Sequence, residues 1–292
     1  MLDVTPDSVI AVDGGGTRCR VALATSDDTC VVEVGAANIS TDFDAALAEI
    51  ALGLSNLCDK TSLSAEQIRE LPAYLGIAGT TGLALADKLA KALPLNHAQV
   101  EDDRPAALIG ALGSRDGAIA HCGTGSFLAA SANGIMRLAG GWGPVLGDEA
   151  SAQWVGRKTL GATLNALDCL AIGTPLVDEI LNHFGSSEAI VAFAAKASPA
   201  DFGLLAQRTT RLAAGGDAIA MSVLTEAAGH IADALPKLGW TSSMALCLTG
   251  GIGPVYARYL PADLQSSLVD PAGTPLDGAI TLARKFCREV AS

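Results

Sequence analysis

The sequence of 292 residues is poor in charged and in aromatic side chains, which make up 17% and 4% of it. Half of the residues are apolar, so the chain can bury the cores of two lobes of ordinary domain size. Basic residues are fewer than acidic ones, with 19 Lys and Arg against 31 Asp and Glu, which gives a net charge of -12. Because binding to nucleic acid depends on basic residues that neutralise phosphates, we expect no nucleic-acid partner.

The sequence also lacks the spacings that mark disulfide frameworks and zinc sites. None of its seven cysteines forms a Cys-x-x-Cys pair, and none of its four histidines has a His-x-x-x-His or His-Glu-x-x-His spacing. We therefore expect reduced, buried thiols and no protein-bound transition metal.

A long hydrophobic run is missing as well. Residues 117–136, a stretch without Asp, Glu, Lys or Arg that no other exceeds in length, are interrupted by glycine, serine, threonine and asparagine, whereas a membrane span needs about 20 mostly apolar residues. The start "MLDVTPD" is acidic where a secretion signal is basic. We expect a cytoplasmic protein with no membrane partner.

What the sequence does contain is a strand-rich start. Apolar or alternating segments predict strands at 8–12, 19–25 and 29–35, and a 3.6-residue period predicts a helix at 41–57 behind Ser40, Thr41 or Asp42 as a cap. Further strands are expected at 73–79 and 98–101, alternating with helices at 83–93 and 105–112.

The second half repeats this order. Residues 117–141 predict strand, glycine turn, strand, short turn and strand, and "MALCLTGGIG" predicts a late strand that ends at a glycine pair. We expect an α/β protein of two lobes with duplicated mixed-sheet cores around a central cleft. The lobes would be residues 1–112 and 113–292, and the last helix, 276–290, could pack back on the first lobe.

Two glycine turns stand at the heads of these halves: "VDGGGTR" and "HCGTGSF". Each leads into a strand, so neither is the helix-opening dinucleotide or P-loop motif. One such turn alone is most simply a hairpin. Two of them offer backbone amides and hydroxyls from opposite sides of a cleft, as a triphosphate requires.

The ordered set "DGGGT", "GTGS" and "TGGIG" resembles the phosphate and adenosine motifs of the actin-like ATPase and sugar kinase superfamily. Within it, "GGWGPVLGDEASAQWVGRKTL" resembles the sugar-site segment of N-acetylglucosamine kinases and of the related BadF/BadG/BcrA/BcrD ATPases. The stretches "TPLVDEILNHF" and "IVAFAAKASPADFGLLAQ" are similar to bacterial glucosamine kinases. This resemblance covers nearly the whole chain.

The resemblance implies a two-lobe, ribonuclease H-like fold that uses ATP and Mg²⁺. Asp13 would hold the metal, through water as Mg²⁺ commonly requires. The resemblance implies phosphate or nucleotide contacts for ten residues: Gly14, Gly15, Gly16, Thr17, Gly123, Thr124, Gly125, Ser126, Gly250 and Gly251.

The general base is expected in "VEDDRPAA", where a strand runs into a helix. A carboxylate there can accept the proton of a sugar hydroxyl, and the family pattern favours Asp103 over Asp102. Arg104 stands where the family usually has alanine. The plainer interpretation is that the carboxylate caps the helix.

For the sugar, the resemblance implies Asn38 and the segment around Trp142 and Gly143. Asp148 and Glu149 are expected to open the helix that follows, where acidic residues also suit the helix dipole. The implied reaction is phosphorylation of the 6-hydroxyl of D-glucosamine or, second, of N-acetyl-D-glucosamine. A homodimer is expected from the resemblance alone.

Three alternatives stay open. One is an ATPase that activates a partner enzyme, as BadF/BadG-type relatives do with cluster-binding cysteines, for which only Cys122 lies near a motif. Another is a sugar sensor without catalysis. The third is a kinase for a different hexose, such as glucose.

Overall fold

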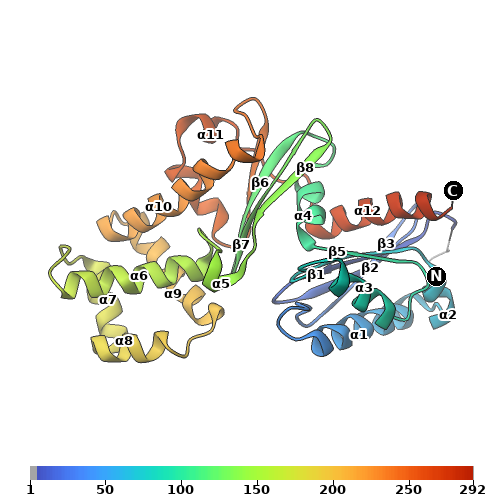
Figure 1. Cartoon of the computed structure of the whole chain (residues 1–292), viewed down its shortest axis with the longest axis horizontal. Coiled ribbons are helices and arrows are strands. Elements are labelled where there is room, and N and C mark those ends of the chain that lie inside the picture. Colours follow the sequence, from blue (N-terminus) through green and yellow to red (C-terminus); the bar gives the residue numbers. More distant parts are fainter. Residues whose placement is uncertain (1–4, 292) are drawn as a thin grey trace. The chain divides into compact units, whose positions relative to one another are not determined.

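The computed structural model describes residues 5–291, which form two compact units (Figure 1). The first unit combines the chain up to Ser114 with the chain from Pro271 onward, and the second comprises Arg115–Asp270. Each unit has a mixed sheet of its own, and the closing helix of the chain belongs to the first unit.

The first unit contains a five-stranded sheet in the order β3-β2-β1-β4-β5. Its strands are β1 (Val9–Gly14), β2 (Cys19–Ala24), β3 (Thr29–Val34), β4 (Ala73–Ile77) and β5 (Ala98–Glu101). Strands β1, β2 and β3 pair antiparallel, while β4 is parallel to both β1 and β5. The expected strands of this half are confirmed, and the carboxyl ends of β1, β4 and β5 share one edge of the sheet.

Helices cover both faces of this sheet. They are α1 (Phe43–Thr61), α2 (Ala65–Glu70), α3 (Leu83–Ala92), α4 (Asp103–Leu112) and α12 (Pro275–Val290). Ile10 and Val12 of β1 pack in one core with residues of α1, and Val9 and Ala11 pack in another with residues of α12. This alternation along β1 follows from the two-residue period of a strand.

Two helix boundaries differ from the sequence prediction. Helix α4 begins at Asp103, two residues before the expected start, because Asp102 provides its cap. Helix α2 was missed, since it is only six residues long and buries one side chain, Ile68. Its capping box between Ser64 and Gln67 is the sequence signal that could have revealed it.

The second unit contains a four-stranded sheet in the order β8-β7-β6-β9. Its strands are β6 (Gly117–Cys122), β7 (Ser126–Ala132), β8 (Ile135–Gly140) and β9 (Ala245–Thr249). As in the first unit, the leading strand pairs antiparallel with the next one and parallel with a strand that comes after a crossover. The expected repeat of topology is therefore present in the two sheets.

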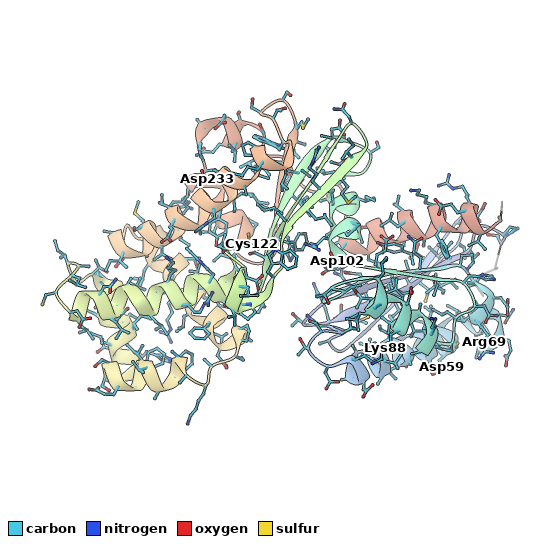
Figure 2. The ribbon with its side chains drawn as sticks, viewed as in Figure 1. Asp59, Arg69, Lys88, Asp102, Cys122 and Asp233 are labelled. Atoms are coloured by element: carbon cyan, nitrogen blue, oxygen red, sulfur yellow. The ribbon has the colours of Figure 1, made fainter. Side chains whose placement is uncertain are left out.

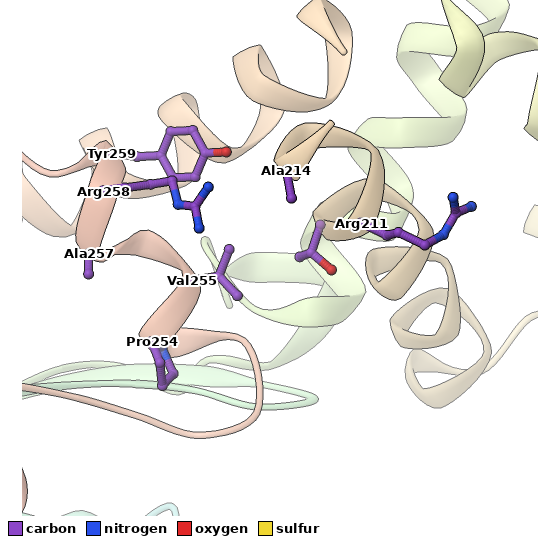
Figure 3. Close-up of a pocket in the computed structure, with 8 residues that line it drawn as sticks. Arg211, Ala214, Pro254, Val255, Ala257, Arg258 and Tyr259 are labelled. Atoms are coloured by element: carbon purple, nitrogen blue, oxygen red, sulfur yellow. The ribbon is translucent and has the colours of Figure 1, made fainter. Parts of the chain in front are cut away.

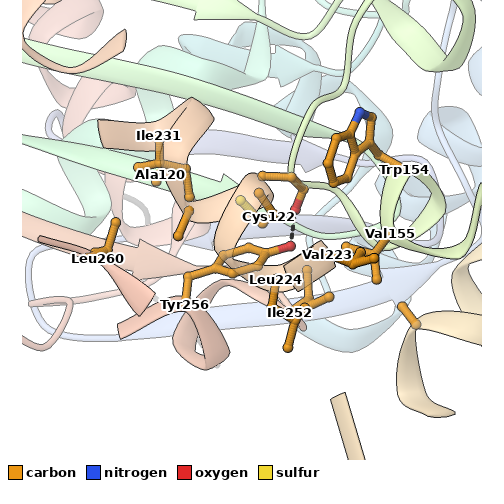
Figure 4. Packing of buried hydrophobic residues seen from close by; sticks show 14 of the residues in the cluster. Ala120, Cys122, Trp154, Val155, Val223, Leu224, Ile231, Ile252, Tyr256 and Leu260 are labelled. Atoms are coloured by element: carbon orange, nitrogen blue, oxygen red, sulfur yellow. Dashed lines mark hydrogen bonds between the residues drawn. The ribbon is translucent and has the colours of Figure 1, made fainter. Parts of the chain in front are cut away.

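Helices form the larger part of the second unit. They are α5 (Gly143–Leu146), α6 (Ala152–Leu167), α7 (Pro175–Phe184), α8 (Ser187–Ala194), α9 (Pro199–Ala214), α10 (Ala218–Ala234), α11 (Ala262–Ser266) and the 3-10 helices η1 (Pro236–Leu238) and η2 (Gly253–Tyr259). Tyr256 lies fully buried in their core, and its hydroxyl donates a 2.6 Å hydrogen bond to the Ala150 carbonyl (Figure 4). This bond ties η2 to the loop before α6.

Among residues 5–291, no helix combines the length and the apolar character needed to cross a membrane. Within the same range, no group of three or more His, Cys, Asp and Glu side chains is arranged to hold a metal ion.

Candidate active site

The first glycine turn joins β1 to β2. Asp13 is the second-to-last residue of β1, and its carboxylate forms a 2.9 Å ion pair with Arg20, its register partner on β2. Burial raises the pKa of Asp13, while the charges of Arg20 and Arg18 oppose that rise. Gly15 closes the turn by donating to the Arg18 carbonyl at 3.0 Å, so the expected hairpin is present.

Thr17 and Gly16 of this turn are exposed, and the space around Gly16 is open. The turn therefore combines a buried carboxylate at its base with uncovered backbone at its tip, the side from which an anionic ligand could approach.

Asp103 lies at the same edge of the sheet, at the start of α4. Gly76 separates it from Asp13, since Gly76 is the register partner of Asp13 on β4. A Cβ atom at Gly76 would lie 3.5 Å from the Asp103 Cα and 3.3 Å from the Ala106 Cβ, so glycine allows α4 to approach β4 closely.

The environment of Asp103 is that of a proton acceptor. Burial, together with the charges of Asp102 and Asp13, raises the pKa of Asp103 to about 7, and the Arg104 charge opposes this rise. A carboxylate with a pKa near neutrality is suited to general acid–base chemistry.

The Asp102 side chain makes hydrogen bonds at the start of α4. Its Oδ1 atom accepts from the Arg104 backbone N–H at 3.0 Å and forms an ion pair with the Arg104 side chain, so Asp102 caps α4. Figure 2 labels Asp102 where β5 passes into α4. Of the two neighbouring aspartates, Asp102 is therefore the helix cap, and Asp103 is the one whose pKa burial raises to about 7.

Asn38 lies in the loop after β3. Its Oδ1 atom accepts from the Ser40 amide, the Ser40 hydroxyl and the Thr41 amide at 2.8–3.2 Å. The neighbouring Ile39 amide donates to the Ala78 carbonyl, just beyond the end of β4. The side-chain oxygen of Asn38 therefore stabilises a turn, the ordinary use of asparagine in a loop.

The second glycine turn joins β6 to β7. The Gly123 amide donates to the Gly125 carbonyl at 2.9 Å, and the Ser126 hydroxyl donates to the Glu149 carbonyl at 2.6 Å. The Ala152 amide donates to the Gly123 carbonyl at 2.8 Å. The turn is thereby fixed to residues 149–152, while Thr124 at its tip is exposed.

The expectation that Asp148 and Glu149 open the next helix is wrong. Helix α6 begins at Ala152, and Ser151 caps it through the Trp154 amide. Asp148 lies in the preceding loop with a left-handed backbone (φ 61°), which aspartate and asparagine tolerate better than most residues. Serine caps helices about as well as aspartate, so both residue types were possible starts for this helix.

The buried Asp148 carboxylate links two segments. Its Oδ1 atom accepts from the Gly143 amide at 3.2 Å, and its Oδ2 atom lies 2.9 Å from where a Gly125 Cβ would stand. Burial raises the pKa of Asp148, whereas the backbone N–H groups of Gly143 and Ser126 lower it. Asp148 thus holds the second glycine turn against the start of α5.

Trp142 precedes α5 with 68% of its side chain exposed, and Glu149 is exposed as well. Val145 and Leu146 of α5 are more than 80% exposed. An indole and two aliphatic side chains are therefore exposed in the same segment as Gly143, whose amide donates to Asp148.

The glycine pair after β9 has two different environments. Gly250 has a positive φ of 80°, and a Cβ atom there would lie 2.3 Å from the Cys122 carbonyl oxygen. The neighbouring Gly251 has nothing within 4 Å of its Cβ position. The positive φ and the close Cys122 carbonyl thus require glycine at position 250. Gly251 leaves open space next to the second glycine turn.

His121 is a residue that the sequence analysis did not select. It lies one residue before Cys122, which Figure 2 labels at the end of β6, and its ring stacks on Phe127 with centroids 5.0 Å apart. The signal that could have found it is positional: His121 is the second-to-last residue of its strand, as Asp13 is of β1.

A separate hollow of about 570 Å³ lies between the end of α9 and η2 (Figure 3). Arg211, Arg258 and Tyr259 are among the eight described residues that line it, and none of the eight is a predicted site residue. Arg211 is already paired with Glu179. Asp13, Asp103 and the glycine turns lie at strand ends and do not line this hollow.

A family model described as the BadF/BadG/BcrA/BcrD ATPase family matches residues 10–262. The chain belongs to this family. Its sequence is 28% identical over 280 residues to the glucosamine kinase GspK of Vibrio cholerae serotype O1, covering 94% of this chain and 95% of that protein.

Solved structures agree with the assignment. A candidate N-acetylglucosamine kinase from Chromobacterium violaceum superposes with a TM-score of 0.82 at 30% identity, over 94% of this chain and 98% of that one. A ROK family glucokinase from Streptomyces griseus, at 16% identity, shares the fold with a TM-score of 0.55, over 95% of this chain and 99% of that one. The expected actin-like ATPase fold is confirmed.

Proposed function

We propose that this family member is an ATP-dependent sugar kinase that phosphorylates the 6-hydroxyl of an amino sugar. D-glucosamine is the first candidate and N-acetyl-D-glucosamine the second. The likeness to the glucosamine kinase GspK over nearly the full length of both chains supports the choice of substrate class. The observation that carries the reaction type is the Asp103 carboxyl, whose pKa is raised to about 7 at a strand-end site beside Asp13.

In the proposed reaction, Asp103 accepts the proton of the sugar 6-hydroxyl. The sugar oxygen then forms a bond to the γ-phosphorus as the bond to the ADP oxygen breaks. A phosphoryl transfer of this kind needs little covalent chemistry from the protein, which mainly positions the groups and stabilises charge. The capping role of Asp102 supports the choice of Asp103 as the base.

Mg²⁺ would be held on the Asp13 side of the site. Mg²⁺ usually keeps several waters and takes one or two carboxylates together with substrate phosphates, so a single buried aspartate at a turn fits it. The ion would neutralise phosphate charge.

The two glycine turns would bind the phosphates. The residues proposed to contact phosphate are Gly14, Gly15, Gly16 and Thr17 in the first turn and Gly123, Thr124, Gly125 and Ser126 in the second. The exposed tips of both turns support this assignment. The open space at Gly251 supports a place for the nucleoside next to the second turn, with Gly250 shaping the backbone.

For the sugar, we propose contacts from Trp142, Gly143 and Glu149, with Asn38 as a further contact through its side-chain amide. The exposed indole offers an apolar surface, and the Glu149 carboxylate offers an acceptor for hydroxyls or for a 2-ammonium group. Asp148 would contribute by holding this segment and, where its oxygens are reached, by accepting a sugar hydroxyl.

The kinase is preferred to an activator ATPase because of Cys122. Its side chain is 1% exposed and packs in the helix-covered core of the second unit. A cluster shared between two subunits would need thiols at the surface of the protein, so the environment of Cys122 supports the kinase.

The test is a coupled ADP-release assay with glucosamine, N-acetylglucosamine, glucose and no sugar, each with Mg²⁺ and ATP. We expect glucosamine to give the highest kcat/KM and turnover without sugar to be negligible. Equal turnover with and without sugar would favour the activator ATPase. Nucleotide binding without turnover on any sugar would favour a sensor, and preference for glucose would reassign the substrate.

A further inference from the structure

His121 occupies in the second unit the position that Asp13 occupies in the first. Each is the second-to-last residue of the leading strand of its sheet, directly before a glycine turn. Each leading strand has an antiparallel partner on one side and a parallel one on the other. Ala118, Ala120 and Cys122 enter the helix-covered core, so the alternation of the strand directs His121 to the opposite face.

The His121 ring is fixed by two neighbours. It stacks on Phe127 of β7 with an angle of 17° between the rings, and its Nδ1 atom lies 3.1 Å from the Thr249 hydroxyl oxygen on β9. Thr249 is the register partner of His121 and directly precedes Gly250. Contacts from both neighbouring strands therefore hold the imidazole in one orientation.

The other ring nitrogen points at the second glycine turn. A Cβ atom at Gly123 would lie 3.4 Å from the His121 Nε2 atom, in van der Waals contact, so a side chain at position 123 would lie against that nitrogen. Across residues 5–291, the only hydrogen-bond contact of the His121 side chain is the one with Thr249. Nε2 thus has no hydrogen-bond partner in the described chain, and glycine keeps the space before it open.

Burial lowers the pKa of His121 below its ordinary value near 6.5, so the ring is neutral at neutral pH. A neutral imidazole carries one N–H, and the hydrogen bond at one nitrogen determines what the other can do. If the Thr249 hydroxyl donates to Nδ1, the proton stands on Nε2 and can be given to an anion.

We propose that His121 donates a hydrogen bond from Nε2 to a phosphate oxygen of the bound nucleoside triphosphate, and that Thr249 selects the tautomer that permits it. This inference rests on the proposed function, since it needs a nucleotide at the second glycine turn. It adds a phosphate-contacting side chain to a turn whose other predicted contacts are backbone amides and hydroxyls.

The test compares the binding of ATP with that of adenosine by titration calorimetry in the presence of Mg²⁺. His121→Phe keeps a ring to stack on Phe127 and removes both nitrogens. We expect it to weaken ATP binding about 10- to 100-fold, the usual range for a hydrogen bond to a charged group. Adenosine has no phosphate, so its affinity should not change.

Two further variants separate the contact from packing. His121→Gln restores a side-chain N–H donor, and we expect ATP affinity closer to wild type than in His121→Phe. Thr249→Val removes the tautomer-selecting hydroxyl, and we expect a loss of ATP affinity of about 2- to 10-fold. His97→Phe replaces an exposed histidine outside the site and should leave both affinities unchanged.

The outcomes are distinguishable. If the wild-type protein binds no ATP, the proposed function fails and the inference falls with it. If wild type binds ATP and folded His121→Phe binds it equally well, the inference is overturned and the kinase stands. An equal loss for ATP and adenosine would indicate packing only, and would also overturn it. If His121→Phe does not fold, unchanged ATP affinity in Thr249→Val overturns the inference.

Discussion

Asp13 and Asp103 lie at the same edge of one sheet, with Gly76 between them, and the charge of Asp13 contributes to the raised pKa of Asp103. Their surroundings make them different. Burial is the largest cause of the raised pKa at both residues, but the paired charge of Arg20 opposes the rise at Asp13, whereas the charges of Asp102 and Asp13 add to the rise at Asp103. Two neighbouring carboxyl groups with different charged neighbours are suited to separate tasks in one reaction.

Asp103→Asn should lower kcat about 10²- to 10⁴-fold, because a positioned base contributes on that order. ATP affinity should stay within a few-fold of wild type. The measurements are the coupled ADP-release assay and ATP titration. The matched control is Asp102→Asn, which keeps a side-chain oxygen that can cap α4, because asparagine caps helices about as well as aspartate, and should keep most of its activity. If Asp102→Asn lost the activity and Asp103→Asn kept it, the base would be Asp102.

The rate should depend on pH through Asp103. The base works only when deprotonated, so with a pKa of about 7 the value of kcat/KM should fall as the pH drops below 7 and level off above it. Asp102→Asn removes a negative charge that raises this pKa, so the falling limb should move to lower pH. If the pH at which kcat/KM falls were the same in Asp102→Asn as in wild type, a group other than Asp103 would be titrating.

Asp148→Ala should lower the free energy of unfolding by about 2–4 kcal/mol. The substitution leaves the Gly143 and Ser126 amides without their acceptor and puts alanine at a left-handed backbone position. Asp148→Asn keeps one acceptor oxygen and a side chain that tolerates this backbone, so it should cost less than half as much. Chemical denaturation measures both, and equal losses would contradict the linking role.

Substitutions of the glycine pair after β9 should behave differently. Gly250→Ala forces a Cβ atom against the Cys122 carbonyl at a positive φ, and should destabilise the protein by about 2 kcal/mol or more. Gly251→Ala meets open space, so its melting temperature should stay close to that of wild type while the KM for ATP rises. An unchanged KM for ATP in Gly251→Ala would remove Gly251 from the nucleotide site.

Trp142→Ala should raise the KM for the sugar without changing the KM for ATP. Because the indole is 68% exposed, its loss should change stability by only about 0.5 kcal/mol. Ile172→Ala is the control: this side chain is 89% exposed in the loop between α6 and α7, outside the proposed site. If both variants kept the wild-type KM for the sugar, Trp142 would not contact it.

Local sequence patterns predicted many of the strands, turns and helices. The alternation in 19–25 and 29–35 predicted β2 and β3, and the glycine turn before Cys19 was recognised as strand-to-strand. Asp42, one of three expected caps, begins α1. These features depend on residues close together in sequence, so a sequence pattern carries them.

The loop before α6 was less predictable. Asp148 and Glu149 have the charge expected of a first helical turn, yet Ser151 caps the helix. Hydrogen bonds from Gly143 to Asp148 and from Ser126 to the Glu149 carbonyl hold this loop out of the helix. The bond from Ser126 joins residues 23 positions apart, so no pattern within the loop itself predicts it.

The sequence by itself determined where the strands and the glycine turns lie, because backbone preference and hydrophobic period act over a few residues. Only the tertiary structure decided that Asp102 caps α4 while Asp103 titrates near neutrality, and that the Nε2 atom of His121 points at Gly123. A pKa and the direction of a ring depend on burial and on neighbouring strands, and those are brought together only by folding.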